Sequence, residues 1–149
     1  MIISKLNPWD FYTKKTKNEY YLVILTSGSI FKNFKGSILR GSLKEAREKI
    51  PNIEYLLGSK MRGIRNEVWH IIDNIYSFPI KHRWHETTDM GLVEKSAREL
   101  LVVSNKIGAA GYGNKFIIPR LTISNCGIDS LAVENIFEEY FDHRFIIAE

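Results

Sequence analysis

The chain has 149 residues, of which 44% are hydrophobic and 26% are charged, and its formal net charge is +4 at pH 7. This length and composition fit one globular domain over residues 1–149 and argue against a disordered chain. No apolar run approaches the roughly 20 residues of a membrane span, the N-terminus lacks the apolar core of a signal peptide, and the single cysteine excludes an internal disulfide, so we expect a cytoplasmic protein.

The first predicted elements are a strand, a glycine-containing loop and a helix. Tyr20–Leu25 is a continuous apolar run, which is typical of a strand buried on both faces. The letters TSGS that follow predict a turn that ends this strand. After the loop from Gly36 to Gly41, Ser42 and Glu45 form a capping-box pattern, which predicts that a helix begins at Ser42.

The rest of the chain alternates between strand-like and helix-like patterns. Residues 67–73 and 74–80 resemble two strands with a break between them, and Thr88 or Asp89 is expected to cap a long helix that ends near Gly108. The other predicted elements are a short helix at 54–63, a strand at 115–123, an amphipathic helix at 129–143 and a strand at 144–149. This alternation indicates an α/β fold with helices covering a central sheet.

Three loops are candidates for a binding site, because ligands of α/β sheets lie beyond the carboxyl ends of strands. The loop before Ser42 carries Arg40 and two glycines, and it fits either an anion site at a helix start or a plain capped connection. The second loop, residues 119–130, contains Asn125 and Gly127 and fits either a ribose or anion contact or a turn.

The third loop is strongly basic, with Lys81, His82, Arg83 and His85 around Trp84. It fits a cationic and aromatic ligand wall, a nucleic-acid contact, or a solvated loop with a packed tryptophan. The spacing of the two histidines suits half of a metal site, but no third ligand has a diagnostic spacing. We therefore expect no metal and no other cofactor.

Several segments, taken in chain order, resemble macro-domain-like proteins of bacteria and phages. SFPIKHRWHETTDMGLVEKSAREL, at residues 77–100, is similar to a strand that ends in S-F-P-x-K-H and is followed by a tryptophan and a helix. GSILRGSLKEAREKIP resembles a loop and helix that usually read M-G-x-G-x-A, and IIPRLTISNCGID resembles L-P-R-P-G-C-G-N-G-G-L-D. NPWDFY resembles the opening strand and turn, and EEYFDHRFIIA resembles the closing helix and strand.

This resemblance implies a single macro-domain-like three-layer sandwich over residues 1–149, with helices flanking a mixed central sheet. Such proteins typically bind ADP-ribose, and some hydrolyse ADP-ribosyl esters or ADP-ribose phosphates without a metal. In this family adenine lies near the opening turn, the distal ribose meets an asparagine turn, and the diphosphate lies between two glycine loops. The residues that the resemblance assigns to the ligand are Asn7, Ser27, Arg40, Gly41, Ser42, Asn125 and Gly127.

The binding loops depart from the family pattern. Ser27 replaces the turn asparagine, Leu39 replaces the first loop glycine, and the glycine-rich run after Pro119 is altered.

The first hypothesis is therefore a module that binds ADP-ribose or a related nucleotide, with hydrolase activity weak or lost. The alternative is a remodelled domain that binds a protein, for example a phage-encoded inhibitor of a host enzyme in the host cytoplasm. The loop residues Lys81 to Trp84 would then form the contact surface.

A third hypothesis is nucleic-acid binding, which the sequence favours least. Its residues would be Lys32, Lys35, Arg40, Lys44 and Lys81. Affinity that falls steeply with salt would be its signature.

Overall fold

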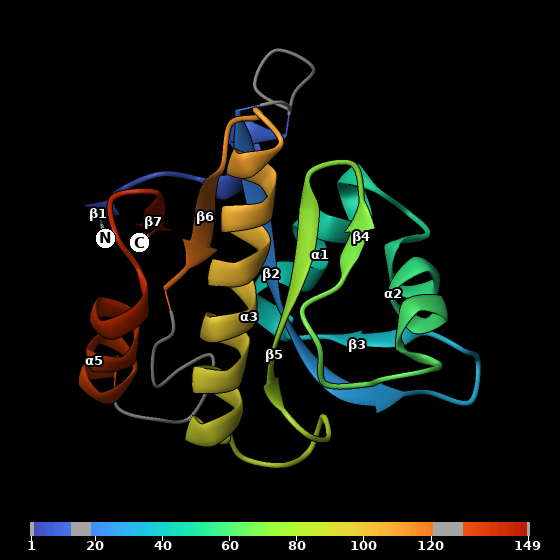
Figure 1. Ribbon diagram of the computed structural model, residues 1–149. Helices are drawn as coiled ribbons and strands as arrows, with labels where there is room; N and C mark the ends of the chain where they lie inside the picture. The colour runs from blue at the N-terminus through green and yellow to red at the C-terminus, as the bar shows by residue number, and fades with distance from the viewer. Residues whose placement is uncertain (1, 13–18, 121–129, 149) are drawn as a thin grey trace.

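The structure is a computed structural model that describes residues 2–12, 19–120 and 130–148 (Figure 1). The strands are β1 (Ile2–Ser4), β2 (Tyr20–Ile30), β3 (Gly36–Ile38), β4 (His70–Ile72), β5 (Ile75–Lys81), β6 (Lys115–Pro119) and β7 (Phe145–Ala148). The helices are the 3-10 helix η1 (Pro8–Phe11) and the α-helices α1 (Arg40–Lys49), α2 (Ile53–Met61), α3 (Met90–Ala109) and α5 (Ser130–Tyr140). None of these helices is long and apolar enough to cross a membrane.

The strands form one mixed sheet in the order β1-β7-β6-β2-β5-β4, with β3 paired to β2 alongside this path. β1, β7, β6, β2 and β5 run parallel to their neighbours, whereas β3 and β4 are antiparallel to β2 and β5. The carboxyl ends of β2, β5 and β6 therefore point to the same edge of the sheet, the lower edge in Figure 1. The predicted α/β class with a mixed central sheet is confirmed.

Helices cover both faces of the sheet and bury two separate hydrophobic cores. Alternate residues of β2 serve the two sides, because successive side chains of a strand point in opposite directions. Val23 and Leu25 pack in the core beneath α3 and α5, and Leu22 and Ile24 pack in the core beneath α1, α2 and η1. This division explains why the run at residues 20–25 is continuously apolar, and it produces the predicted three-layer sandwich.

Two expected boundaries of the later elements are confirmed. A break separates β4 from β5 at Asp73, which has a φ of 50°. Of the two expected caps of α3, Asp89 is the one that the structure uses, with its carboxylate accepting from the backbone N–H groups of Gly91 and Leu92. Gly108 lies within α3, which continues to Ala109.

Three predictions for the segment before and within α1 are wrong. TSGS does not turn, because Thr26 and Ser27 continue β2 by pairing with β5, and both are almost fully buried there. Gly36–Ile38 is a strand rather than part of a loop. Helix α1 begins at Arg40, so its N-cap is Leu39 and Ser42 lies inside the first turn. The Leu39 N–H donates to the Leu25 carbonyl at 2.9 Å, which fixes this earlier start beside β2.

A tight hairpin joins β2 to β3 through residues 31–35. The Phe34 N–H donates to the Phe31 carbonyl and the Phe31 N–H donates to the Lys35 carbonyl, both at 2.9 Å. Phe34 has a φ of 68°, as expected for the last residue of a three-residue hairpin loop. Glycine or asparagine is favoured there, and a bulky residue in this left-handed region is strained.

Replacing Phe34 by asparagine is expected to leave the free energy of unfolding unchanged or to raise it by up to about 1 kcal/mol, because asparagine tolerates the left-handed conformation better. The Phe34 ring is 63% exposed, so its loss removes little packing. Urea unfolding of the two proteins measures the difference. A loss of more than about 1 kcal/mol would show that the ring supports the fold.

Candidate functional site

The N-terminus of α1 lies at the carboxyl edge of the sheet, and its N-cap residue does not cap it. Its N-cap residue, Leu39, is extended (φ −69°, ψ 151°), and its apolar side chain makes no cap hydrogen bond. The first N–H groups of a helix have no acceptor within the helix, and the helix dipole makes this end positive. The α1 terminus can therefore accept an anion.

The N-terminus of α3 is different, because its own carboxylate fills it. Asp89 Oδ1 accepts from the Gly91 N–H at 2.8 Å and from the Leu92 N–H at 3.3 Å. The other carboxylate oxygen lies 2.8 Å from His82 Nε2. The hydrogen bond with His82, followed by that from the Leu92 N–H, lowers the pKa of Asp89 below its ordinary value. The N-cap residue of α3 thus occupies this helix end, whereas Leu39 does not occupy that of α1.

The lowered pKa predicts how acid affects the cap. Because the folded state holds the Asp89 proton less tightly than the unfolded state, the stabilisation is complete above the ordinary pKa of 3.8 and is lost as pH falls below it. Urea unfolding of the wild type and of Asp89→Asn should therefore differ at neutral pH and converge as the pH falls below 3.8. The difference is expected to be below about 1 kcal/mol, since the Asp89 side chain is 45% exposed. A difference that grows in acid would contradict this assignment.

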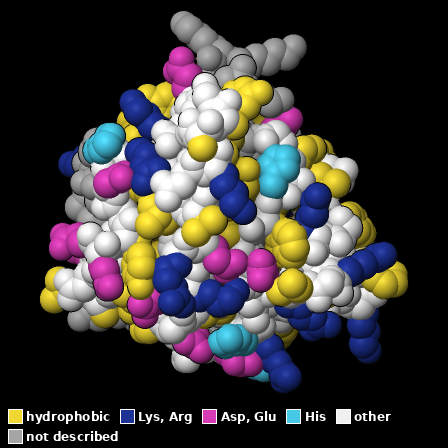
Figure 2. All heavy atoms as spheres, in the orientation of Figure 1, with side chains coloured by type: hydrophobic (Ala, Val, Ile, Leu, Met, Phe, Trp, Pro, Cys, Tyr) yellow, Lys and Arg dark blue, Asp and Glu magenta, His cyan; other side chains and the backbone are white. Residues whose placement is uncertain are grey.

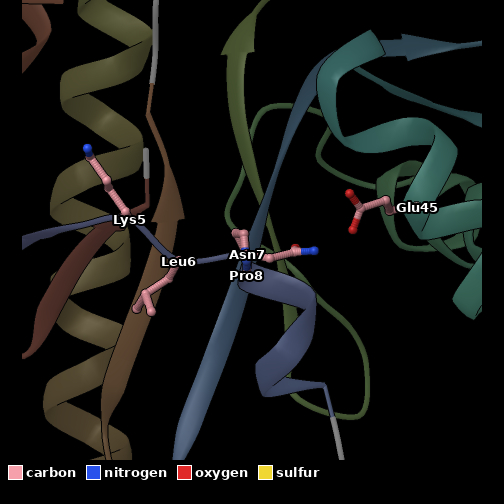
Figure 3. A pocket seen from close by; sticks show the side chains of 5 residues that line it. All are labelled: Lys5, Leu6, Asn7, Pro8 and Glu45. Atoms are coloured by element: carbon pink, nitrogen blue, oxygen red, sulfur yellow. The ribbon is translucent and has the colours of Figure 1, made fainter.

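A shallow cavity of about 600 Å³ lies on one side of α1, between this helix and the segment that joins β1 to η1. Asn7, from that segment, extends its side chain towards Glu45 of α1 (Figure 3). Asn7 Oδ1 accepts from the Trp9 N–H at 3.1 Å and so caps η1. Its amide nitrogen remains for the cavity, opposite the Glu45 carboxylate, so the two walls offer a donor and an acceptor.

A second cavity, of about 510 Å³, lies against another face of α1. Leu39, Leu43 and Arg47, spaced four residues apart, turn towards it. Its other lining residues are Phe31, Ser37, Ile38, Glu54, Lys81 and Trp84. The Arg47 guanidinium bonds both oxygens of the buried Glu54 carboxylate, at 2.5 and 3.1 Å, and this bond raises the pKa of Arg47 further. Lys81, at the end of β5, adds an ammonium group to the wall of this cavity.

Contacts with β2 and with Asn66 hold the basic loop after β5 in place. The Trp84 N–H donates to Ser29 Oγ at 2.9 Å, and Asn66 Nδ2 lies 3.2 Å from His82 Nδ1. At Gly28 a Cβ would collide with the His82 carbonyl oxygen and with Asn66. A glycine is therefore required where the loop crosses the end of β2, and Trp84, still 58% exposed, is presented beside the second cavity.

The structure brings together only some of the residues that the sequence assigned to the ligand. Asn7 lines the first cavity, and residues 40–42 form the first turn of α1. Ser27 is 1% exposed within β2, and its hydroxyl accepts from the Ser29 N–H at 3.4 Å. Asn125 and Gly127 lie outside the described residues.

The residues of the proposed interaction surface also separate. Lys81 and Trp84 line the second cavity, whereas His82 bonds Asp89 and Arg83 pairs with Glu86 at 3.6 Å. Sequence reasoning missed Phe31, Ser37 and Glu54, because only the hairpin and the packing of α2 bring them to the cavity. Within the described ranges, no group of three or more histidine, cysteine, aspartate or glutamate side chains is placed to hold a metal ion.

The fold is that of a macrodomain. The macrodomain of Thermus aquaticus DarG is similar over 99% of this chain and 97% of its own, with 15% identity and a TM-score of 0.64. The macrodomain of Mycobacterium tuberculosis DarG is similar over the same shares, with 16% identity and a TM-score of 0.59. Thermosipho africanus DarTG, solved in complex with ADP-ribose, matches 89% of this chain and 38% of its own, with 14% identity and a TM-score of 0.65.

These likenesses are structural. No protein-family model matches the sequence, and no curated protein sequence matches it. The structural similarity thus confirms the expected macro-domain fold. At sequence identities of 14–16% it does not identify the ligand, which has to be inferred from the residues of the site.

Proposed function

We propose that the chain binds ADP-ribose or a related nucleoside diphosphate at the α1 end of the sheet. The observation that carries the proposal is the N-terminus of α1, whose N-cap residue, Leu39, has no side chain that can cap the helix, at the carboxyl edge of the parallel strands. A diphosphate placed there would accept hydrogen bonds from backbone N–H groups and be favoured by the helix dipole. The fold is shared with a protein that was solved with ADP-ribose.

In this proposal the two cavities beside α1 take the two ends of the ligand. The adenine contacts Asn7 and Glu45, whose amide and carboxylate offer a donor to ring nitrogens and an acceptor for the exocyclic amine. The distal ribose extends towards Lys81 and Trp84. Asn125 and Gly127 are assigned to the facing loop from the sequence alone.

Isothermal titration with ADP-ribose tests this function. Saturable heat of ADP-ribose binding supports the proposal if Asn7→Ala reduces it. The matched control Tyr112→Ser, at an exposed residue, should leave this heat unchanged. Tyr112 suits the control because it lies between α3 and β6 and is 65% exposed. Absence of heat at millimolar ADP-ribose overturns the proposal.

We further propose that turnover is weak or absent. Ser27, which stands in place of the turn asparagine, is almost completely buried, and its hydroxyl is engaged with the Ser29 N–H. A group so enclosed is badly placed to hold or activate a water molecule beside a ribose. Mass spectrometry of an ADP-ribosylated protein incubated with the chain is expected to show no release of ADP-ribose, and rapid release would contradict this proposal.

A further inference from the structure

The β2–β3 hairpin, helix α2 and the segment that follows α2 expose four large apolar side chains. Phe31, Phe34, Tyr55 and Ile64, hereafter the aromatic patch, are 40%, 63%, 48% and 55% exposed. They belong to two short segments, residues 31–35 and 55–65, that contact each other. Aromatic side chains gathered on a rigid surface are the usual anchors of protein interfaces.

The same two segments are strongly basic. They contain five cationic residues and no acidic one: Lys32, Lys35, Lys60, Arg62 and Arg65. Figure 2 shows dark blue and yellow side chains gathered at the lower right, over the hairpin and α2. The nearby Glu54 is buried and bonded to Arg47, so it does not offset this charge. A partner for this surface must therefore be anionic.

Two of the cations are already placed over the rings. Lys35 Nζ lies 5.2 Å from the centroid of the Tyr55 ring, and Arg62 Cζ lies 5.3 Å from the centroid of the Phe34 ring. Both distances are within the range of cation–π attraction. The surface thus presents an organised pair of positive groups, each supported by an aromatic face.

The backbone beneath the patch is held closely. A Cβ at Gly58 would collide with the Phe34 carbonyl oxygen and lie 3.0 Å from the Gly36 nitrogen, so the hairpin packs directly on α2. Phe34 itself keeps a φ of 68° while its ring is largely exposed. A strained backbone that gains little packing is a reason to look for a function of the side chain.

We propose that this face docks an acidic protein surface in which carboxylates flank an apolar anchor. The carboxylates would bond Lys35 and Arg62, and the anchor would contact the Phe34 and Tyr55 rings. Single-stranded nucleic acid fits less well, because bases bind by stacking on free aromatic faces and these rings already carry a cation on one face. Phe34, Lys35, Tyr55 and Arg62 line neither of the two cavities beside α1, so this inference is independent of the nucleotide proposal.

The test begins with a displayed library of random peptides, selected on the wild-type protein and counter-selected on Phe34→Asn and Arg62→Gln. We expect the recovered peptides to be rich in aspartate and glutamate around a leucine or an aromatic residue. One such peptide, labelled with fluorescein, is then titrated by fluorescence anisotropy at low and high salt. An oligodeoxythymidylate carrying the same label is titrated in parallel.

Each of the two variants is expected to weaken peptide binding about tenfold, and added salt is expected to weaken it further. The matched controls Tyr112→Ser and Lys106→Gln remove an exposed aromatic ring and an exposed cation elsewhere, and they should bind like the wild type. Urea unfolding of Phe34→Asn and Arg62→Gln at or above the wild-type stability shows that both variants remain folded. Recovery of no acidic peptide, binding by both variants as tight as by the wild type, or tighter binding of the oligonucleotide than of the peptide would each overturn the proposal.

Discussion

Replacing Gly58 by alanine is expected to lower the free energy of unfolding by about 1–3 kcal/mol, because the added methyl group enters space that backbone atoms already fill. The Phe34 carbonyl oxygen and the Gly36 nitrogen occupy this space. Neither can move alone, since Phe34 belongs to the hydrogen-bonded turn and Gly36 pairs with Ile30 in β2. Helix α2 and the hairpin must therefore separate, which disturbs the core residues between them.

Gly63 provides the matched control, because a Cβ built there has no neighbour within 4 Å. Gly63→Ala is expected to change the free energy of unfolding by less than about 0.5 kcal/mol. Urea unfolding of both variants gives the comparison. Equal stabilities of the two variants would show that the hairpin can shift away from α2 at little cost.

Loss of the close contact between Gly58 and the hairpin should also disturb the aromatic patch. Phe34 and Tyr55 lie on opposite sides of the hairpin–α2 junction, and their cations come from both sides as well. A displaced hairpin therefore separates Lys35 from Tyr55 and Arg62 from Phe34. The patch thus depends on a glycine that faces backbone atoms of the hairpin.

Most of the fold could be predicted from local patterns, because those patterns coincide with what burial requires. The apolar run in β2 predicted a strand covered on both faces, and β2 has one core on each side. Asp89 before a periodic segment predicted the start of α3, and its carboxylate caps that helix. In both cases the local sequence and the tertiary structure favour the same conformation.

The prediction failed where tertiary pairing overrides a local preference. Polar and glycine residues at 26–29 favour a turn, but they lie between β3 and β5, whose hydrogen bonds keep the chain extended. Ser42 is a good N-cap residue, yet the bond from Leu39 to Leu25 starts α1 earlier. Leu39 then packs in the core with Leu25, which no capping rule anticipates.

The sequence indicates the cavity-lining residues that lie near strand or helix boundaries, but not those that only tertiary packing brings to the second cavity. Asn7 and Lys81 are at segment boundaries and line cavities, as polar residues near strand ends often do. Phe31, Ser37 and Glu54 reach the second cavity through the hairpin and α2, which are distant from the basic loop in sequence. Their convergence depends on packing that the sequence alone does not show.

Replacing Arg40 by proline is expected to weaken ADP-ribose binding by about ten- to a hundredfold, because a hydrogen bond to a charged group contributes about 1.5–3 kcal/mol. Arg40 is the first residue of α1, where proline fits the helix and removes only a backbone N–H without an intrahelical acceptor. Leu39 is already extended, as the residue before a proline must be. The variant should therefore fold normally and lose both the Arg40 guanidinium and one backbone donor of the proposed diphosphate site.

Arg40→Ala separates the backbone donor from the side chain, since it removes the guanidinium and keeps the N–H. Both variants lose the guanidinium, but the proline variant is expected to bind ADP-ribose at least several-fold more weakly than the alanine variant, because only proline also removes the backbone N–H bond to the diphosphate. Isothermal titration of the three proteins measures the difference, and urea unfolding checks that both variants are folded. Equal affinities of the proline and alanine variants would remove the α1 terminus from the binding site, even if ADP-ribose binds elsewhere on the chain.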